Sequence, residues 1–244
     1  MDNAVIQVEK LCKSFGDNHV LRDFSVSVNE GENVAVLGKS GSGKSVLIKC
    51  IIRLIEADSG NITVLDQNIR SLSRQELDKI RINIGFLFQS NALYDSMTVR
   101  ENLEFSLRRH WTKEQRREQA EQAIQEALED VGLQHTINMM PAELSGGMKK
   151  RIALARTLIL RPSIILYDEP TTGLDPITAR EISQLIVSVR EKYNTSSLII
   201  SHDMSCIRIT AKRIVMLIDG KCYADDSYDV LSRSHDSRIR EFFE

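Results

Sequence analysis

The sequence predicts an α/β fold around a mostly parallel sheet, and three observations lead to this prediction. A continuous apolar run at residues 34–37 precedes a glycine-rich turn and a helical pattern over residues 44–55, as is typical of a strand buried on both faces and the helix after it. Residues 163–167 and 197–200 repeat the short apolar strand pattern around a helical stretch. Between these parts, residues 99–133 contain no proline and a single glycine. Strands and helices that alternate in this way form α/β domains.

The remaining elements follow in chain order. Residues 5–8 and 24–28 have apolar side chains spaced by two, which predicts half-exposed strands. Residues 214–218 predict a further strand, and the Asp219-Gly220 pair after it is a hairpin signal. In the middle segment, apolar side chains fall on one face of a helix, which predicts a mainly helical insertion between two α/β halves. These side chains are Ala120, Ala123, Ile124, Ala127, Leu128 and Val131.

Composition narrows the class of protein. The chain has 244 residues, with 32 Lys and Arg against 34 Asp and Glu, so its net charge is −2. This near balance argues against a nucleic-acid binder, whose affinity rests on positive charge. The longest apolar run, residues 214–218, is far shorter than the roughly 20 residues of a membrane-spanning helix. The N-terminus lacks a secretory signal pattern, and the four cysteines are widely scattered. We therefore expect a cytoplasmic protein with reduced thiols.

Eight residues in the glycine-rich turn fit the pattern G-x-x-x-x-G-K-[ST], after a strand and at the start of a helix. Glycines let successive backbone N–H groups turn toward phosphate oxygens, and the helix N-terminus adds partial positive charge. In this pattern the lysine binds the β- and γ-phosphates and the last hydroxyl binds Mg²⁺. A chance glycine-rich loop is the alternative, and the correct flanks favour the phosphate site. The eight residues are Gly38, Lys39, Ser40, Gly41, Ser42, Gly43, Lys44 and Ser45.

A strand that ends in two acids supplies the second half of this site. Asp168 and Glu169 follow apolar residues 164–167, at the carboxyl edge of the sheet where open α/β folds bind ligands. We expect Asp168 to hold Mg²⁺ through its water shell and Glu169 to orient and deprotonate an attacking water. A solvated turn is the alternative for an acid pair taken alone, but the phosphate loop upstream favours the catalytic role.

Residues 144–148, with the sequence Leu-Ser-Gly-Gly-Met, predict a second anion site. Ser145 is suited to cap a helix that we expect to run to about Leu160. Three cations at residues 149–151 lie in its first turns, where each opposes the helix dipole by about 0.3–1 kcal/mol unless an anion is near. The Gly-Gly pair, the hydroxyl and these cations together favour an anion site over a solvated basic turn.

Taken in order, these motifs resemble the nucleotide-binding domain of an ATP-binding cassette (ABC) transporter over nearly the full chain. Six motifs in the expected order, besides one aromatic residue, make the resemblance specific. Residues 38–45 resemble the Walker A loop, residues 164–169 the Walker B strand with its catalytic glutamate, residues 144–148 the signature, and residues 173–175 the D-loop. Phe15 is similar in position to an adenine-stacking aromatic, Gln89 to the Q-loop glutamine and His202 to the switch histidine.

The resemblance implies a P-loop NTPase fold of ABC type. This fold has a mostly parallel sheet core, an N-terminal antiparallel β subdomain and an inserted helical subdomain. Residues 1–244 then form a single ATPase domain, in which residues 1–89 and 151–244 make the core and residues 90–150 the helical signature subdomain. It also implies a homodimer with ATP between the two chains. Since the sequence contains one Walker A loop and one signature, such a two-site sandwich requires a second chain.

The resemblance further assigns roles to the site residues, with ATP and Mg²⁺ as ligands. Glu169, His202 and Gln89 are the catalytic residues, and Ser45, Gln89 and Asp168 hold the metal. The nucleotide contacts come from Phe15, Gly38, Lys39, Ser40, Gly41, Ser42, Gly43, Lys44, Ser45, Val46, Ser145, Gly146, Gly147 and Asp175.

Within that family, residues 87–99 resemble the ATPases of Mla-type phospholipid transporters. Met148, residues 173–178 and residues 236–243 point the same way. This resemblance implies a separate MlaE-like membrane permease, a lipid-binding MCE-domain protein as a further partner, no nucleic-acid partner, and a location on the inner face of the cell membrane. Residues 90–97 are then the place where the permease docks. The alternative is that their apolar side chains, Leu93, Tyr94 and Met97, pack into the core of the helical subdomain.

Three residues depart from the family pattern, and, separately, two other functions within the ABC family stay open. Met148 replaces a glutamine that can form a hydrogen bond, Val46 replaces a common threonine whose hydroxyl contacts the α-phosphate, and Gly173 replaces a commoner alanine-like residue. An ABC importer ATPase for another substrate, such as an amino acid, is one alternative function. A soluble ABC ATPase without a permease, such as an iron–sulfur assembly factor, is another.

Overall fold

The computed structural model describes residues 3–244, which form two sheets and the helices packed around them. The smaller sheet is antiparallel, with strand order β2-β1-β4-β5. Its strands are β1 (Ala4–Phe15), β2 (Asn18–Asn29), β4 (Ser59–Val64) and β5 (Gln67–Asn68). The predicted strands at the N-terminus are therefore confirmed, and both extend further than the alternating pattern indicated.

The larger sheet has the strand order β10-β9-β3-β8-β7-β6. All neighbouring strands are parallel except the β9–β10 pair, which forms the hairpin predicted at Asp219-Gly220. The fold class and its mostly parallel core are thus confirmed. The strands are β3 (Asn33–Leu37), β6 (Ile84–Leu87), β7 (Ile164–Asp168), β8 (Ser196–Ser201), β9 (Arg213–Ile218) and β10 (Lys221–Ser227).

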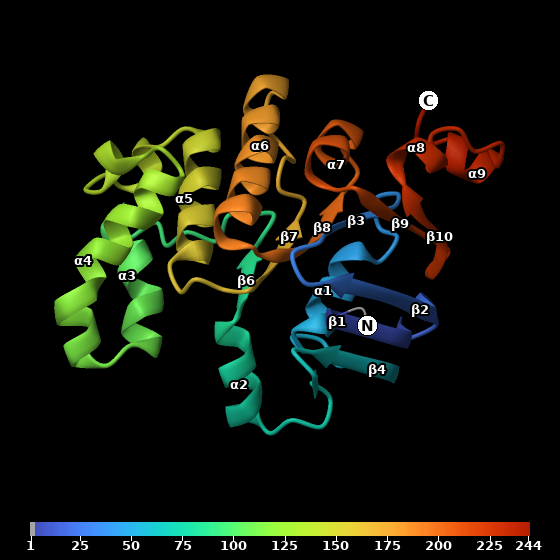
Figure 1. The fold of residues 1–244 in the computed structure, drawn as a ribbon, viewed down its shortest axis with the longest axis horizontal. Coiled ribbons are helices and arrows are strands. Elements are labelled where there is room, and N and C mark those ends of the chain that lie inside the picture. Colours follow the sequence, from blue (N-terminus) through green and yellow to red (C-terminus); the bar gives the residue numbers. More distant parts are fainter. Residues whose placement is uncertain (1–2) are drawn as a thin grey trace.

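Helices cover both faces of the parallel sheet (Figure 1). Helices α6 and α7 lie on one side and α1 on the other, while α3 and α4 form one end of the molecule, away from the antiparallel sheet. The helices are α1 (Lys44–Ile51), α2 (Arg74–Ile82), α3 (Val99–His110), α4 (Lys113–Asp130), α5 (Gly146–Leu158), α6 (Pro176–Tyr193), α7 (Met204–Thr210), α8 (Tyr228–Leu231) and α9 (Ser237–Arg240), with short 3₁₀ turns at Gln134–Thr136 and Pro141–Glu143.

The continuous apolar strands are explained by burial on both faces. Along β7, Ile164 and Leu166 join the core beneath α1, and Ile165 and Tyr167 join the core beneath α5 and α6. All four side chains are fully buried. Since side chains alternate across a strand, a strand between two helical layers needs an apolar residue at every position.

Two predicted boundaries differ in detail. Helix α1 ends at Ile51 rather than at residue 55, and α5 ends at Leu158 rather than at Leu160. The predicted division between residues 150 and 151 falls inside α5. No helix in residues 3–244 is long and apolar enough to cross a membrane.

The buried side-chain amide of Asn102 holds the loop before α3 in place. Asn102 lies on α3 with no exposed surface. Its side chain accepts a hydrogen bond from the Tyr94 N–H at 2.8 Å and donates to the carbonyls of Tyr94, Met97 and Thr98 at 3.0–3.1 Å. A single side chain therefore bonds four backbone groups of the loop before α3.

Replacing Asn102 by leucine should destabilise the protein, because a side chain of similar volume then leaves the buried contacts to the Tyr94 N–H and the Met97 carbonyl unmade. We expect the free energy of unfolding to fall by about 2 kcal/mol or more, measured by urea denaturation. Gln122→Leu, at an exposed position of α4, is the matched control and should change stability by less than about 0.5 kcal/mol. Equal stability of the two variants would contradict the role given to Asn102.

Candidate functional site

The candidate site lies where the carboxyl ends of parallel strands meet. The loop of residues 38–45 follows β3, Asp168 ends β7 and His202 follows β8. Strand β8 lies between β3 and β7 in the sheet, so all three segments reach the same edge. The topology thus brings together residues that are far apart in the sequence.

The glycine-rich loop adopts a backbone that side chains would obstruct. Gly43, just before α1, has a φ of 102°, and a Cβ there would lie 2.6 Å from the Val20 side chain. A Cβ on Gly38 would lie 2.7 Å from the Leu217 carbonyl oxygen. No side chain caps the N-terminus of α1, and no acid lies in its first turn. The start of α1 therefore keeps its positive character for an anion.

Lys44 places a buried positive charge inside this loop. Only 5% of the residue is exposed, and its ammonium donates to the carbonyls of Gly38 at 2.7 Å and Lys39 at 3.0 Å. One carboxylate oxygen of Glu169 lies 3.8 Å from the ammonium. Burial lowers the pKa of Lys44, while the charges of Glu169 and Asp168 act in the opposite direction. A phosphate at this place would add a second anionic partner for the ammonium, besides Glu169.

Ser45 and Asp168 form the part of the site that suits Mg²⁺. The Ser45 hydroxyl donates to Asp168 Oδ1 at 2.8 Å, across 123 positions of sequence. Burial raises the pKa of Asp168, and the neighbouring Glu169 charge raises it further, so a bound cation would relieve this carboxylate. Residues 3–244 hold no cluster of three or more acidic, histidine or cysteine side chains suited to a metal. The Ser45 hydroxyl and the Asp168 carboxylate fit Mg²⁺, which is commonly bound through one or two carboxylates, water and substrate phosphates.

Glu169 is held by contacts on several sides. Its carboxylate lies 2.8 Å from His202 Nδ1 and accepts a hydrogen bond from the Thr172 hydroxyl at 3.1 Å. Its backbone has a φ of 51° and donates to the Ile200 carbonyl at 2.9 Å. Such left-handed backbone in a residue other than glycine is unfavourable and persists where the surroundings fix it. The structure thus holds a buried carboxylate at the site, beside the Lys44 ammonium.

Sequence reasoning missed two threonines that organise this loop. Thr172 contacts Glu169 directly, and the buried Thr171 donates to Asp203 Oδ2 at 3.0 Å. Asp203 in turn caps α7 by accepting from the Ser205 and Cys206 N–H groups. The sequence signal for these residues is two adjacent threonines shortly after the end of β7. Such pairs are too common in loops to identify a function.

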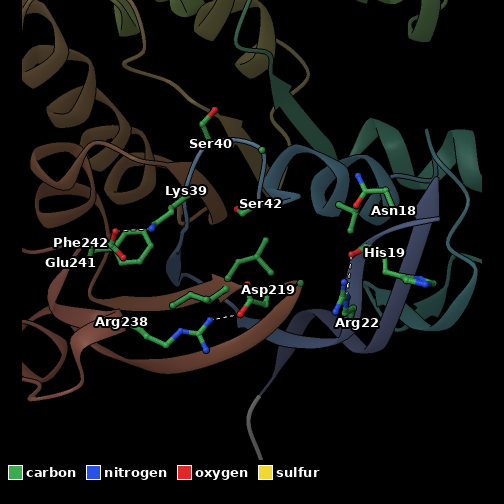
Figure 2. Close-up of a pocket in the computed structure, with 15 residues that line it drawn as sticks. Asn18, His19, Arg22, Lys39, Ser40, Ser42, Asp219, Arg238, Glu241 and Phe242 are labelled. Carbon is green, nitrogen blue, oxygen red and sulfur yellow. Dashed lines mark hydrogen bonds and ion pairs between the residues drawn. The ribbon is translucent and has the colours of Figure 1, made fainter. Parts of the chain in front are cut away.

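A cavity of about 500 Å³ opens beside the glycine-rich loop. Lys39, Ser40, Gly41 and Ser42 form one wall, and Ser42 Oγ is buried without a hydrogen-bond partner in residues 3–244. Figure 2 shows the other walls, which come from the start of β2, the β9–β10 turn, and α9 with the residues directly after it. This last wall was not predicted, and Glu241, directly after α9, forms an ion pair with the Lys39 ammonium at 2.7 Å.

Phe15 lies at the rim of this cavity. It pairs in the sheet with Asn18, which lines the cavity, and half of its surface is exposed. The Lys13 ammonium lies 5.2 Å from the centre of the phenyl ring. An exposed aromatic ring at this position suits the stacking role that the sequence predicted.

Other predicted residues lie outside this cluster. No hydrogen bond or ion pair within residues 3–244 joins the glycine-rich loop to Ser145, Gly146 or Gly147. Ser145 caps α5 by accepting from the Met148 N–H at 3.2 Å, as predicted. Asp175 caps α6 through the N–H groups of its first turn. The exposed Gln89 follows β6 at the same sheet edge as Asp168, and Val46 packs partly against the core.

The predicted second anion site requires a correction. Lys150 is buried, with 2% of the residue exposed, and its ammonium donates to the Gln89 carbonyl at 3.0 Å. Arg151 forms an ion pair with Glu181 at 2.7 Å. The prediction that both cations serve an anion at the start of α5 is therefore wrong, because these side chains are bound within the chain.

Comparison with known proteins agrees with this geometry. The model of the ABC transporter family matches residues 21–172. BztD of Rhodobacter capsulatus, a glutamate/glutamine/aspartate/asparagine transport ATP-binding protein, is 34% identical over 99% of this chain and 90% of its own. The probable ribonucleotide transport ATP-binding protein mkl of Mycobacterium leprae is 37% identical over 98% of this chain and 68% of its own. Protein TRIGALACTOSYLDIACYLGLYCEROL 3, chloroplastic, of Arabidopsis thaliana is 37% identical over 90% of this chain and 67% of its own.

A solved structure extends the comparison to the fold and its ligands. The dimer of the ATP-binding cassette MJ0796, in a post-hydrolysis state bound to ADP and Pi, has a TM-score of 0.80 and 31% identity, covering 91% of this chain and 98% of that one. Cassettes of this family bind ATP and Mg²⁺, dimerise and pair with membrane permease subunits. The chain therefore belongs to the ABC transporter family, as an ATP-binding subunit with ATPase activity.

Proposed function

We propose that this ATPase drives phospholipid transport through a separate membrane permease of the MlaE kind. The observation that carries the proposal is the segment of residues 87–99, which resembles Mla-type ATPases and exposes Tyr94 next to Phe105 of α3. The name of the Arabidopsis relative contains that of a glycolipid, which supports a lipid substrate. An MCE-domain lipid-binding protein is the further partner that this assignment implies.

The geometry supports a division of labour among the site residues. Phe15 stacks on adenine, the loop of residues 38–45 surrounds the phosphates, and the Lys44 ammonium neutralises their charge. Ser45, Asp168 and Gln89 would hold Mg²⁺, whose chemistry is to neutralise negative charge on the β- and γ-phosphates. The buried Ser42 hydroxyl without a partner is a further group in this loop that a phosphate oxygen could satisfy.

Hydrolysis then depends on Glu169. Its carboxylate orients the attacking water and accepts a proton from it as the bond to the γ-phosphorus forms and the bond to the bridging oxygen breaks, with ADP as the leaving group. His202 lies 2.8 Å from this carboxylate and helps to position it, while more than half of its own side chain is exposed. A positioned base of this kind contributes about 10²–10⁴-fold to the rate.

A second copy of the chain completes the site in this proposal. No hydrogen bond or ion pair in the described part of the chain joins Ser145, Gly146 or Gly147 to the glycine-rich loop, and Ser145 and Gly146 are exposed. Backbone N–H groups at the start of α5 are suited to bind an anion. In the homodimer, ATP bound to one Walker A loop would meet the signature of the partner subunit, and Asp175 lies near that contact.

Glu169→Gln tests the catalytic assignment. The amide keeps the shape of the side chain but cannot accept the proton, so ATP binding and ATP-driven dimerisation should persist while turnover falls by at least about 10²-fold. Nucleotide binding is measured by fluorescence, dimerisation by size-exclusion chromatography with ATP, and turnover by phosphate release. Glu118→Gln, at an exposed position of α4, should behave as the wild type. Undiminished turnover in Glu169→Gln would refute the assignment.

The proposed permease contact lies over the loop before α3. The rings of Tyr94 and Phe105 are 4.7 Å apart and are 41% and 38% exposed. Asn102 and Arg156 bind the backbone of this loop at Tyr94 and Ala92. The loop is therefore held by contacts that do not involve the Tyr94 ring. Leu93 instead packs partly against the core, which favours the alternative of core closure for that residue.

Tyr94→Glu should release the permease without loss of ATP binding, because a charge then lies on the apolar contact while the backbone bonds to Asn102 remain. The experiment co-expresses the chain with its permease and measures both subunits after detergent extraction of membranes. Leu54→Glu introduces a charge at another exposed apolar position and should leave the complex intact. Loss of ATP binding in Tyr94→Glu would assign this residue to core packing instead.

An importer of polar solutes is the second candidate, favoured by the 34% identity to BztD across nearly both chains. Mass spectrometry of the extracted complex distinguishes the two, since stoichiometric phospholipid supports the lipid proposal and a bound amino acid supports the importer. A chain recovered only from the soluble fraction, without any membrane subunit, would support the non-transport alternative.

A further inference from the structure

The ammonium of Lys150 is buried where packing alone would favour an apolar side chain. The residue lies on α5 with 2% of its surface exposed, and no carboxylate within residues 3–244 forms an ion pair with it. Removing an ammonium from water without a paired carboxylate is unfavourable. Charged groups whose burial costs this much free energy often have a functional role.

The contacts of Lys150 are made to the backbone of the Q-loop. Its ammonium donates to the carbonyl of Gln89 at 3.0 Å and to that of Phe88 at 3.4 Å. These residues follow Leu87, which is paired with Tyr167 at the end of β7. Fixing this backbone therefore fixes where Gln89 leaves the sheet, beside Asp168.

A second cation from the same helix holds the next part of the loop. The Arg156 guanidinium donates to the carbonyls of Asn91 at 3.1 Å and Ala92 at 2.6 Å. It also lies 5.9 Å from the centre of the Tyr94 ring. Helix α5 thus binds four backbone carbonyls of one short segment through two side chains.

The segment that these cations hold is strained. Asn91 and Ala92 have φ values of 62° and 51°, which are unfavourable for residues with a Cβ. The Asn91 Oδ1 atom is buried without a hydrogen-bond partner. Strained backbone persists when its surroundings fix it, and here the fixing groups come from α5. The loop conformation therefore depends on the position of that helix.

We propose that Lys150 is a positioning residue for Gln89, which holds the Q-loop at the Mg²⁺ side of the Walker site and links it to the signature helix. The inference rests on the proposed function, in which Gln89 reaches the metal and the γ-phosphate. Helix α5 begins at the signature that the partner subunit's nucleotide would contact. Movement of α5 toward that nucleotide would therefore carry the Gln89 backbone with it, so each site senses the occupancy of the other.

Lys150→Met tests this link in the full chain, because methionine fills a similar volume but donates no hydrogen bond. We expect nucleotide affinity to stay at the wild-type level, kcat to fall about tenfold or more through misplacement of Gln89, and the Mg²⁺ concentration for half-maximal rate to rise. Lys150→Arg, which retains a donating cation, should restore most of kcat. Lys113→Met, an exposed lysine of α4, is the matched control and should match the wild type.

A double-mutant cycle shows whether Lys150 acts through Gln89. Gln89→Ala removes the side chain to be positioned, so Lys150→Met should have little further effect on kcat in that background. An equal loss of kcat in both backgrounds would overturn the proposal. So would wild-type kcat in Lys150→Met, or a joint loss of kcat and nucleotide affinity that Lys150→Arg fails to rescue. If Lys150→Met does not fold, Lys150→Gln enters the same cycle with the same expectations.

The Glu169→Gln measurement separates this inference from the proposed function. If Glu169→Gln and Gln89→Ala both lower turnover but Lys150→Met does not, the site assignment stands and only the link fails. If neither Glu169→Gln nor Gln89→Ala lowers turnover, the proposed roles of the site residues fail, and the link through Lys150 falls with them.

Discussion

Three buried charges at one edge of a parallel sheet set the requirements for the rest of this molecule. Lys44, Asp168 and Glu169 are each less than a tenth exposed, and an ionised group taken out of water must find partners close by. The glycine-rich loop offers carbonyls to the ammonium, and Ser45 and His202 serve the two carboxylates. The strands that carry these residues must therefore keep their register, because a shift of one residue would turn each side chain away.

That requirement explains the layered architecture. Strands β3, β7 and β8 are buried on both faces, so their apolar side chains alternate between a core beneath α1 and cores beneath α5, α6 and α7. Parallel strands need crossover connections, and those connections are the helices that cover the faces. The same connections return each strand to the edge where phosphate and metal would meet. Packing and chemistry are thus satisfied by one topology.

Local chemistry could be predicted from the sequence, and pairs between distant residues could not. The loop of residues 38–45, the acids at the end of β7 and the Ser145 cap each depend on neighbours within a few positions, and the structure contains them. The ion pair of Lys39 with Glu241 joins positions that no sequence pattern connects. The position of Lys150 in the first turns of α5 predicted that its ammonium would be available to bind an anion. In the structure the ammonium is instead buried and donates to the Gln89 carbonyl, 61 positions earlier in the chain.

One short backbone segment, residues 89–94, joins the sheet edge that carries the candidate site to the proposed permease surface. Gln89 lies at the edge beside β7, and Tyr94 lies on the surface five positions later, a span of at most about 17 Å for extended chain. Between them, α5 binds the carbonyls of Asn91 and Ala92 through Arg156. Because residues 88–92 are bound to α5 at several carbonyls, this segment should move together with α5 rather than change its own conformation. Displacement of α5 would therefore change both the proposed metal side of the site and the surface offered to a permease.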